Sequence, residues 1–111
     1  RVRPIGHLHR RARVLGAEMS KRGATIRRTD TNQSEIVRAL REVGASVQTI
    51  HTIGGGCPDL LVGFRGDNYV LEVKFGTGKL SPDETDWFSR WQGQRAIVRD
   101  VDEALSAIGA I

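Results

Sequence analysis

The sequence has little cysteine, few aromatic residues and no long apolar segment. Its single cysteine, Cys57, excludes an internal disulfide and a zinc site built from several cysteines, so a reducing, cytoplasmic setting is expected. No run approaches the roughly 20 apolar residues that a membrane-spanning helix needs, so no membrane partner is expected. The 111 residues suffice for one small domain and leave no room for a second core.

Excess positive charge is also missing from most of the chain. The full sequence carries 17 Lys and Arg residues against 13 Asp and Glu residues, a net charge of +4. Five of the arginines and one glutamate fall within residues 1–18, so the remaining 93 residues balance at 12 basic and 12 acidic groups. The basic surplus therefore says nothing about nucleic-acid binding by the rest of the chain.

The basic N-terminal segment differs in character from the rest of the sequence. Residues 1–18 show no periodic apolar face and precede Met19, the only methionine. We expect residues 1–30 to form a basic, flexible leader, with the natural start at Met19, and residues 31–111 to form the domain. A basic arm that contacts phosphates is the alternative for the same segment.

Beyond the leader, local patterns predict a helix and then a strand. Asn32 with Glu35 three residues on has the spacing of a helix N-cap, and an apolar stripe continues until Gly44. Residues 46–53 are rich in β-branched side chains and predict a strand that includes His51. A run of three glycines ends this strand.

The second half of the domain begins with a predicted hairpin. Strands at 59–64 and 68–75 flank an Arg-Gly-Asp turn; a helix then opens at Ser81, a short strand spans 95–99 and a last helix ends the chain. The second helix carries aromatic side chains that we expect on its buried face: Trp87, Phe88 and Trp91. The element order αβββαβα, with a right-handed parallel crossover in its strand–helix–strand unit, predicts an α/β fold with a central mixed four-stranded sheet flanked by helices.

The chemistry-bearing residues lie in the hairpin. If its strands pair across a four-residue loop at 65–68, Leu61 lies opposite Glu72 and Asp59 lies opposite Lys74. Opposed residues and alternate residues along a strand share a face, so the two acids and the lysine project from one side. The other side is continuously apolar and suits a layer of helices.

Two carboxylates and a lysine on one face suit metal-assisted phosphodiester hydrolysis. Mg²⁺ prefers oxygen ligands, which carboxylates and a backbone carbonyl supply, and Mn²⁺ is expected to substitute for it. Such an ion can bind a phosphate oxygen, lower the pKa of a bound water and stabilise charge at phosphorus. Lys74 would hold the attacking hydroxide or neutralise the transition state, and the glycines before Asp59 would let a phosphodiester approach the backbone closely.

These residues resemble the motif of a known nuclease superfamily. Pro58-Asp59, twelve intervening residues and Glu72-Val73-Lys74 resemble the PD-(D/E)XK nucleases. The stretch GGGCPDLLVGFRGDNYVLEVK is most similar to the small phage-type VRR-NUC and Holliday-junction-resolvase-like branch. The resemblance extends from about residue 30 to the C-terminus and implies a restriction-endonuclease-like αβββαβ core.

The resemblance also implies roles for individual residues. By that likeness, Asp59 and Glu72 bind Mg²⁺, the carbonyl of Val73 adds a ligand and Lys74 assists the attacking water. Glu35 matches the placement of a further acidic ligand on the first helix. These residues are therefore the candidate catalytic and metal-binding set.

Several assignments stay open. The spacing that suits Glu35 as a ligand recurs at Ser81–Glu84 and Asp100–Glu103, where capping alone explains it, so Glu35 is either a ligand or a helix cap. Related nucleases often place a polar residue on the second helix, and the candidates for that position are Lys79, Asp83 and Glu84. Glu72 and Lys74 have the further alternative of being a solvated surface charge pair.

The function that this resemblance implies, together with the residues of the hairpin, is that of an Mg²⁺-dependent deoxyribonuclease. It would be an endonuclease on branched or structured DNA, as in Holliday-junction resolvases, in the cytoplasm of a bacterial or phage-infected cell. Because one site cuts one strand, a homodimer is expected. The alternatives are a catalytically inert nuclease-fold DNA-binding module and a nuclease subunit of a larger restriction or repair assembly.

Overall fold

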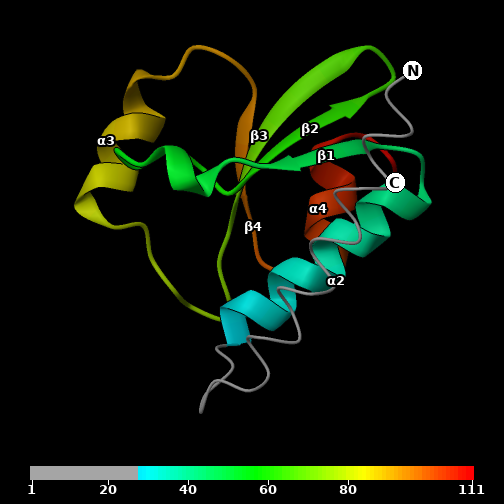
Figure 1. The fold of residues 1–111 in the computed structure, drawn as a ribbon, viewed down its shortest axis with the longest axis horizontal. Helices are drawn as coiled ribbons and strands as arrows, with labels where there is room; N and C mark the ends of the chain where they lie inside the picture. The colour runs from blue at the N-terminus through cyan, green and yellow to red at the C-terminus, as the bar shows by residue number, and fades with distance from the viewer. Residues whose placement is uncertain (1–27) are drawn as a thin grey trace.

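The computed structural model describes residues 28–111, so most of the predicted leader lies outside the described residues. The chain forms a four-stranded sheet with three α-helices and one short 3-10 helix (Figure 1). In chain order the elements are α2 (Arg28–Glu42), β1 (Ser46–Thr49), η1 (His51–Ile53), β2 (Leu60–Phe64), β3 (Asp67–Val73), α3 (Pro82–Arg90), β4 (Arg95–Val98) and α4 (Val101–Ala107). Within residues 28–111, no helix has the length and apolar character needed to cross a membrane.

The sheet has the predicted mixed topology. Its strands lie in the order β1-β2-β3-β4, with antiparallel pairing across the first three and parallel pairing between β3 and β4. Helix α3 connects the two parallel strands, which is the usual way to return a chain to the same end of a sheet. The predicted element order and the central mixed four-stranded sheet are therefore confirmed.

Helix α2 begins earlier than the sequence predicts. It starts at Arg28, so Asn32 lies inside it and the predicted N-cap at Asn32 is wrong. The side chain of Asn32 is nearly buried and donates to the backbone carbonyls of Lys74, at 3.1 Å, and Arg99, at 2.8 Å. This amide therefore joins α2 to the chain at the ends of the parallel strands β3 and β4.

Strand β1 is shorter than predicted because the chain turns after Thr49. The backbone N–H of Ile50 donates to the carbonyl of Asp59 at 2.8 Å, and the next three residues form η1. The expectation that His51 lies on a strand is wrong, since it begins this 3-10 helix. The β-branched residues were a misleading signal here, because a 3-10 turn accommodates them as well.

The hairpin turn is tighter than predicted. Phe64 pairs with Asp67 across a two-residue turn, Arg65-Gly66, in which both residues have positive φ, 52° and 87°. Positive φ at both central positions is what a type I′ turn requires, and this turn matches the twist of the flanking strands. The predicted four-residue loop is therefore wrong by two residues. A change of two residues in the register of the hairpin keeps every side chain on its predicted face of the sheet.

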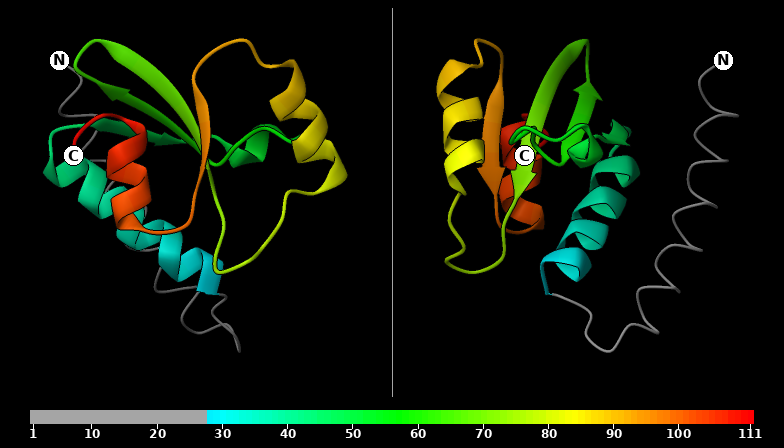
Figure 2. Two further views of the ribbon diagram at one scale, coloured as in Figure 1. Left: turned by 180° about the vertical axis from the view of Figure 1, so that it is seen from behind. Right: turned by 60° about the vertical axis from the view of Figure 1, so that its left-hand side comes forward.

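One face of the sheet holds the hydrophobic core. Helices α2 and α4 lie beside each other against this face, whereas α3 lies on the other side of the sheet (Figures 1 and 2). Fully or nearly fully buried apolar side chains fill the space between the sheet and these two helices: Ile36, Leu40, Leu60, Val62, Leu71, Val73, Val98, Ala104 and Ile108. The core is therefore built from one face of β2, β3 and β4 and the inner faces of α2 and α4.

The aromatic residues of α3 are not core residues. No residue of α3 is buried, and Trp91, directly after the helix, has 44% of its surface exposed. Trp87 stacks on Trp91 with ring centroids 4.6 Å apart and an angle of 16° between the rings. The expectation of a buried aromatic face is wrong, because α2 and α4 already occupy the apolar face of this narrow sheet.

Candidate active site

A cavity of about 470 Å³ lies where α2, η1, the ends of β2 and β3, and the start of α3 meet. The hairpin supplies four of the predicted site residues, and the helices supply the other lining residues. The full lining is Thr29, Asp30, Gln33, His51, Asp59, Glu72, Val73, Lys74 and Glu84. The fold thus brings together Asp59, Glu72 and Lys74, as the hairpin pattern predicts, and Val73 also lines the cavity.

Asp59 is held in place by the strand beside it. It comes after the buried Pro58 and directly precedes β2, and its Oδ2 accepts a hydrogen bond from the backbone N–H of Val73 at 2.8 Å. Burial raises the pKa of Asp59, and the Val73 N–H and the nearby His51 oppose that rise. One carboxylate oxygen is therefore used to fix the side chain against β3.

Glu72 is the most deeply buried acid of the site. Only 3% of its surface is exposed, and its Oε1 atom is buried without a hydrogen-bond partner in the described residues. Burial first, and then the carboxylates of Asp59 and Glu84, raise the pKa of Glu72 to about 8. A buried oxygen without a partner is costly unless a cation or a donor arrives to satisfy it.

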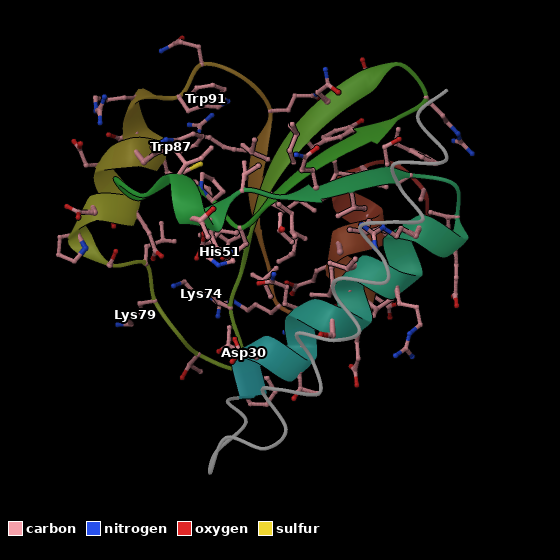
Figure 3. All side chains as sticks on the ribbon, viewed as in Figure 1. Asp30, His51, Lys74, Lys79, Trp87 and Trp91 are labelled. Carbon is pink, nitrogen blue, oxygen red and sulfur yellow. The ribbon has the colours of Figure 1, made fainter. Side chains whose placement is uncertain are left out.

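Lys74 lies between two carboxylates. Its Nζ is 2.9 Å from Glu84 Oε1 and 3.3 Å from Glu72 Oε2. Burial lowers the pKa of Lys74, but the hydrogen bond to Glu84 and the charge of Glu72 outweigh it, so the pKa is raised overall. Lys74 is therefore held as an ammonium ion. Figure 3 shows this side chain in the same region as His51 and Asp30.

Helix α3 contributes Glu84 to the cavity. Of the three open candidates for a polar residue near the second helix, Glu84 lines the cavity, whereas Lys79 and Asp83 do not. The loop before β2 lies directly against the start of α3, because a Cβ on Gly56 would be only 2.2 Å from the carbonyl oxygen of Asp83. With a φ of 85° as well, this position requires glycine.

Glu35 is not brought to the other site residues. It is exposed on α2 and does not line the cavity, so its role as a ligand stays a prediction. Helix α2 instead presents Asp30 and Gln33 there. These two residues are three apart and share a helix face, a signal that becomes visible only when the helix is started before Asn32.

Two further residues near the site, His51 and Cys57, differ in their exposure to solvent. His51 is exposed at the cavity, which sequence reasoning missed because it placed this residue in a strand. Cys57 is partly buried, and burial together with the Glu72 and Asp59 carboxylates raises the pKa of its thiol. A raised thiol pKa disfavours a nucleophilic role for Cys57.

The donor set suits a hard divalent cation. Asp59 and Glu72 offer carboxylate oxygens, and the unsatisfied Oε1 of Glu72 is an acceptor that such an ion would satisfy. Among residues 28–111, no group of three or more His, Cys, Asp and Glu side chains is arranged to hold a metal. Carboxylate oxygens suit a hard cation better than they suit zinc, which prefers nitrogen and sulfur ligands.

Comparison with known proteins identifies the fold. No family model matches the chain, and no curated protein matches it. A search of solved structures finds a structure titled "VRR_NUC domain", with 22% sequence identity and a TM-score of 0.62. The match covers 72% of this chain and 92% of that chain. The chain thus has a restriction-endonuclease-like α/β fold, with a mixed four-stranded sheet flanked by helices, which confirms the predicted fold class.

Proposed function

We propose, from the nuclease fold shared with a VRR_NUC domain, that this chain is a divalent-metal-dependent deoxyribonuclease. The observation that carries the proposal is the buried, unsatisfied Oε1 of Glu72, in one cavity with Asp59 and Lys74. A solvated surface pair would not bury a carboxylate to 3% exposure beside two other acids. A cation beside a fixed ammonium ion would stabilise the negative charge that develops at phosphorus during phosphodiester hydrolysis.

Each site residue has a distinct part in the proposed reaction. Asp59, Glu72 and the carbonyl of Val73 would hold Mg²⁺ or Mn²⁺, and the ion would supply Lewis-acid stabilisation of charge at phosphorus. Lys74 supplies a second, fixed positive charge for the attacking oxygen or for the charge that develops on the phosphate. A preorganised charge of this kind contributes roughly 10²- to 10³-fold to a rate.

DNA is the proposed substrate, with a preference for branched or structured forms. Four acids, Asp30, Asp59, Glu72 and Glu84, line the cavity with one lysine, so a phosphate is repelled until a divalent ion binds. A single domain with this cavity would hold DNA weakly. A homodimer would supply a second site for the other strand and raise avidity. We place the protein in the cytoplasm of a bacterial or phage-infected cell.

A second candidate function is that of a nuclease subunit in a larger restriction or repair assembly. It is favoured by large apolar side chains that stay exposed in and near the α3 side of the sheet: Ile53, Leu61, Trp91 and Ile97. A partner protein could cover such side chains. An inert nuclease-fold DNA-binding module is the third alternative, and it has the same fold without turnover.

One experiment separates these functions. Labelled duplex, single-stranded, flap and four-way-junction DNAs are incubated with the purified chain in Mg²⁺, in Mn²⁺ and in EDTA, and Asp59→Ala serves as the control. Metal-dependent cleavage, fastest on junction or flap DNA and absent in Asp59→Ala, is the expected result. Binding without cleavage of any substrate would favour the inert module. Light scattering of the same samples measures the oligomeric state.

A further inference from the structure

A single oxygen atom joins helix α3 to the site lysine. Glu84 Oε1 accepts one hydrogen bond from Lys74 Nζ at 2.9 Å and another from the backbone N–H of Ser81 at 2.8 Å. Ser81 Oγ in turn accepts from the backbone N–H of Glu84 at 3.2 Å, which completes a capping box. Glu84 therefore both caps α3 and holds the ammonium ion.

The helix α4 shows what such a glutamate does when it only caps. Glu103 occupies the corresponding position: its N–H donates to Asp100 Oδ1, and its Oε1 accepts from the backbone N–H of Arg99, each at 2.8 Å. Within residues 28–111, no lysine forms a hydrogen bond with Glu103, and this residue does not line the cavity. Capping thus explains Glu103 fully but leaves the Lys74 contact of Glu84 unexplained.

The contact between Glu84 and Lys74 is partly shielded from water. Their side chains are 22% and 18% exposed, compared with 65% and 67% in the surface pair Asp86–Arg90. Shielding strengthens the attraction between charges and reduces its screening by salt. The pair can therefore fix the position of the ammonium ion in a way that a surface pair cannot.

The position of the ammonium ion matters for Glu72. Lys74 Nζ is already 3.3 Å from Glu72 Oε2, so without Glu84 the lysine would turn fully to that carboxylate. It would then compete with a cation for the same oxygen atoms. Glu84 draws the ammonium ion the other way, to a shorter contact at 2.9 Å.

We propose that Glu84 is a positioning residue of this site: its shorter contact with the Lys74 ammonium ion limits the contact of that ion with Glu72 to Oε2 and keeps Glu72 Oε1 free for the cation. The proposal rests on the proposed nuclease function for its catalytic consequence. Through Glu84, the first turn of α3 would determine where the Lys74 ammonium ion lies. The loop between Lys74 and α3 is itself braced, because Arg99 Nη1 donates to the carbonyls of Gly76 and Gly78 at 2.7 and 2.9 Å.

The test compares two ways of weakening the α3 cap. Glu84→Ala removes both the cap and the lysine contact, and we expect a roughly 10- to 100-fold lower kcat because the lysine is misplaced. Ser81→Ala removes only the hydroxyl side of the cap, and Glu103→Ala removes the matched glutamate of α4; both should keep kcat within about twofold. Glu84→Gln keeps an acceptor oxygen for both bonds and should recover most of the lost rate.

A double-variant cycle identifies the route by which Glu84 acts. If it acts through Lys74, the variant Lys74→Ala/Glu84→Ala is no slower than Lys74→Ala alone. Loss of activity in Ser81→Ala equal to that in Glu84→Ala would overturn the proposal in favour of simple capping. Rate losses that multiply in the double variant would overturn it too.

The same cycle has a readout that does not depend on nuclease activity. Melting temperatures of the four proteins are measured in EDTA, and we expect the two single shifts not to add in the double variant. Additive shifts would show that the two side chains do not interact, and the proposal would fail whether or not the chain cleaves DNA. Absence of cleavage with non-additive shifts would reject the proposed function while keeping the Glu84–Lys74 pair.

Discussion

The two faces of the sheet differ sharply, although the same strands form both. On the face covered by α2 and α4, Leu60 and Leu71 are fully buried. On the opposite face, their neighbour Leu61 is 40% exposed and Glu72 belongs to the cavity. Because side chains alternate along a strand, one short hairpin supplies both a packed core and a charged site. Stability and chemistry are therefore encoded in alternate residues of the same strands.

The difference between the faces predicts its largest effect at the two acids proposed to bind the metal. We expect Asp59→Ala and Glu72→Ala each to abolish DNA cleavage, because each removes a proposed oxygen ligand. At pH 5, below the raised pKa of Glu72, the melting temperature should stay within a few degrees of wild type, since neither side chain is part of the core. Cleavage assays and thermal melts of the same preparations check this. Wild-type activity in both variants would contradict the assignment of the site.

The core face should show the opposite behaviour. Leu71→Ala leaves a cavity under α2 and α4 and should lower the free energy of unfolding by about 2–5 kcal/mol. Leu61→Ala, on the other face of the paired strand, is the matched control and should cost under about 1 kcal/mol, because its side chain is largely exposed. Urea unfolding measures both. Similar losses of unfolding free energy in the two variants would contradict this difference, because they would mean that the sheet face next to α3 is as well packed as the face under α2 and α4.

The burial of Glu72 gives the ion-free protein a pH dependence. Its pKa is raised to about 8 in the folded chain from an ordinary 4.5, so between these values the folded state binds more protons than the unfolded state. The contribution of Glu72 to the free energy of unfolding is therefore greatest below about pH 4.5. It decreases as the pH rises to about 8, by at most about 1.4 kcal/mol per pH unit.

The variant Glu72→Gln isolates this effect. In EDTA it should melt at a higher temperature than wild type at pH 8, and the difference should shrink toward pH 5. Adding Mg²⁺ at pH 8 should stabilise wild type but not the variant, because the ion satisfies the ionised carboxylate. A difference in melting temperature that does not vary with pH would show that Glu72 is ionised throughout.

The smallest expected effect concerns the first helix. Glu35 is exposed and away from the cavity, so Glu35→Gln should change the cleavage rate by no more than about twofold. A loss of rate above tenfold in Glu35→Gln would restore Glu35 as a ligand.

On the same helix, Asp30 lines the cavity, and Asp30→Asn should raise the Mg²⁺ concentration that gives half-maximal rate several-fold.

The sequence predicted the element order and the faces of the hairpin because both depend on local patterns. Alternation places Asp59, Glu72 and Lys74 on one side whatever the turn length, as long as the register shifts by an even number. The register itself was wrong, since it depends on Arg65 adopting a left-handed conformation that the chain pattern does not reveal.

The roles of Asn32 and Glu84 could not be predicted, because they depend on contacts that are distant in the sequence. Asn32 looks like a helix cap because of Glu35, but its amide is satisfied by carbonyls 42 and 67 residues away. Glu84 has the spacing of a capping residue and does cap α3, but its contact with Lys74 appears only when the loop between them folds back. No local pattern distinguishes it from Glu103.

The amide of Asn32 also has a consequence for the order in which the site forms. The amide of Asn32 donates to the carbonyls of both Lys74 and Arg99. Arg99 lies 67 residues after Asn32, so it is added to the growing chain much later. A chain still being synthesised can pair β2 with β3 but lacks the strand β4 that flanks Lys74 on its other side. Closing such long-range contacts is slow and comes late in folding. The backbone around Lys74 should therefore reach its final position only after β4 has been added to the sheet, so the site is completed by the last strand of the domain.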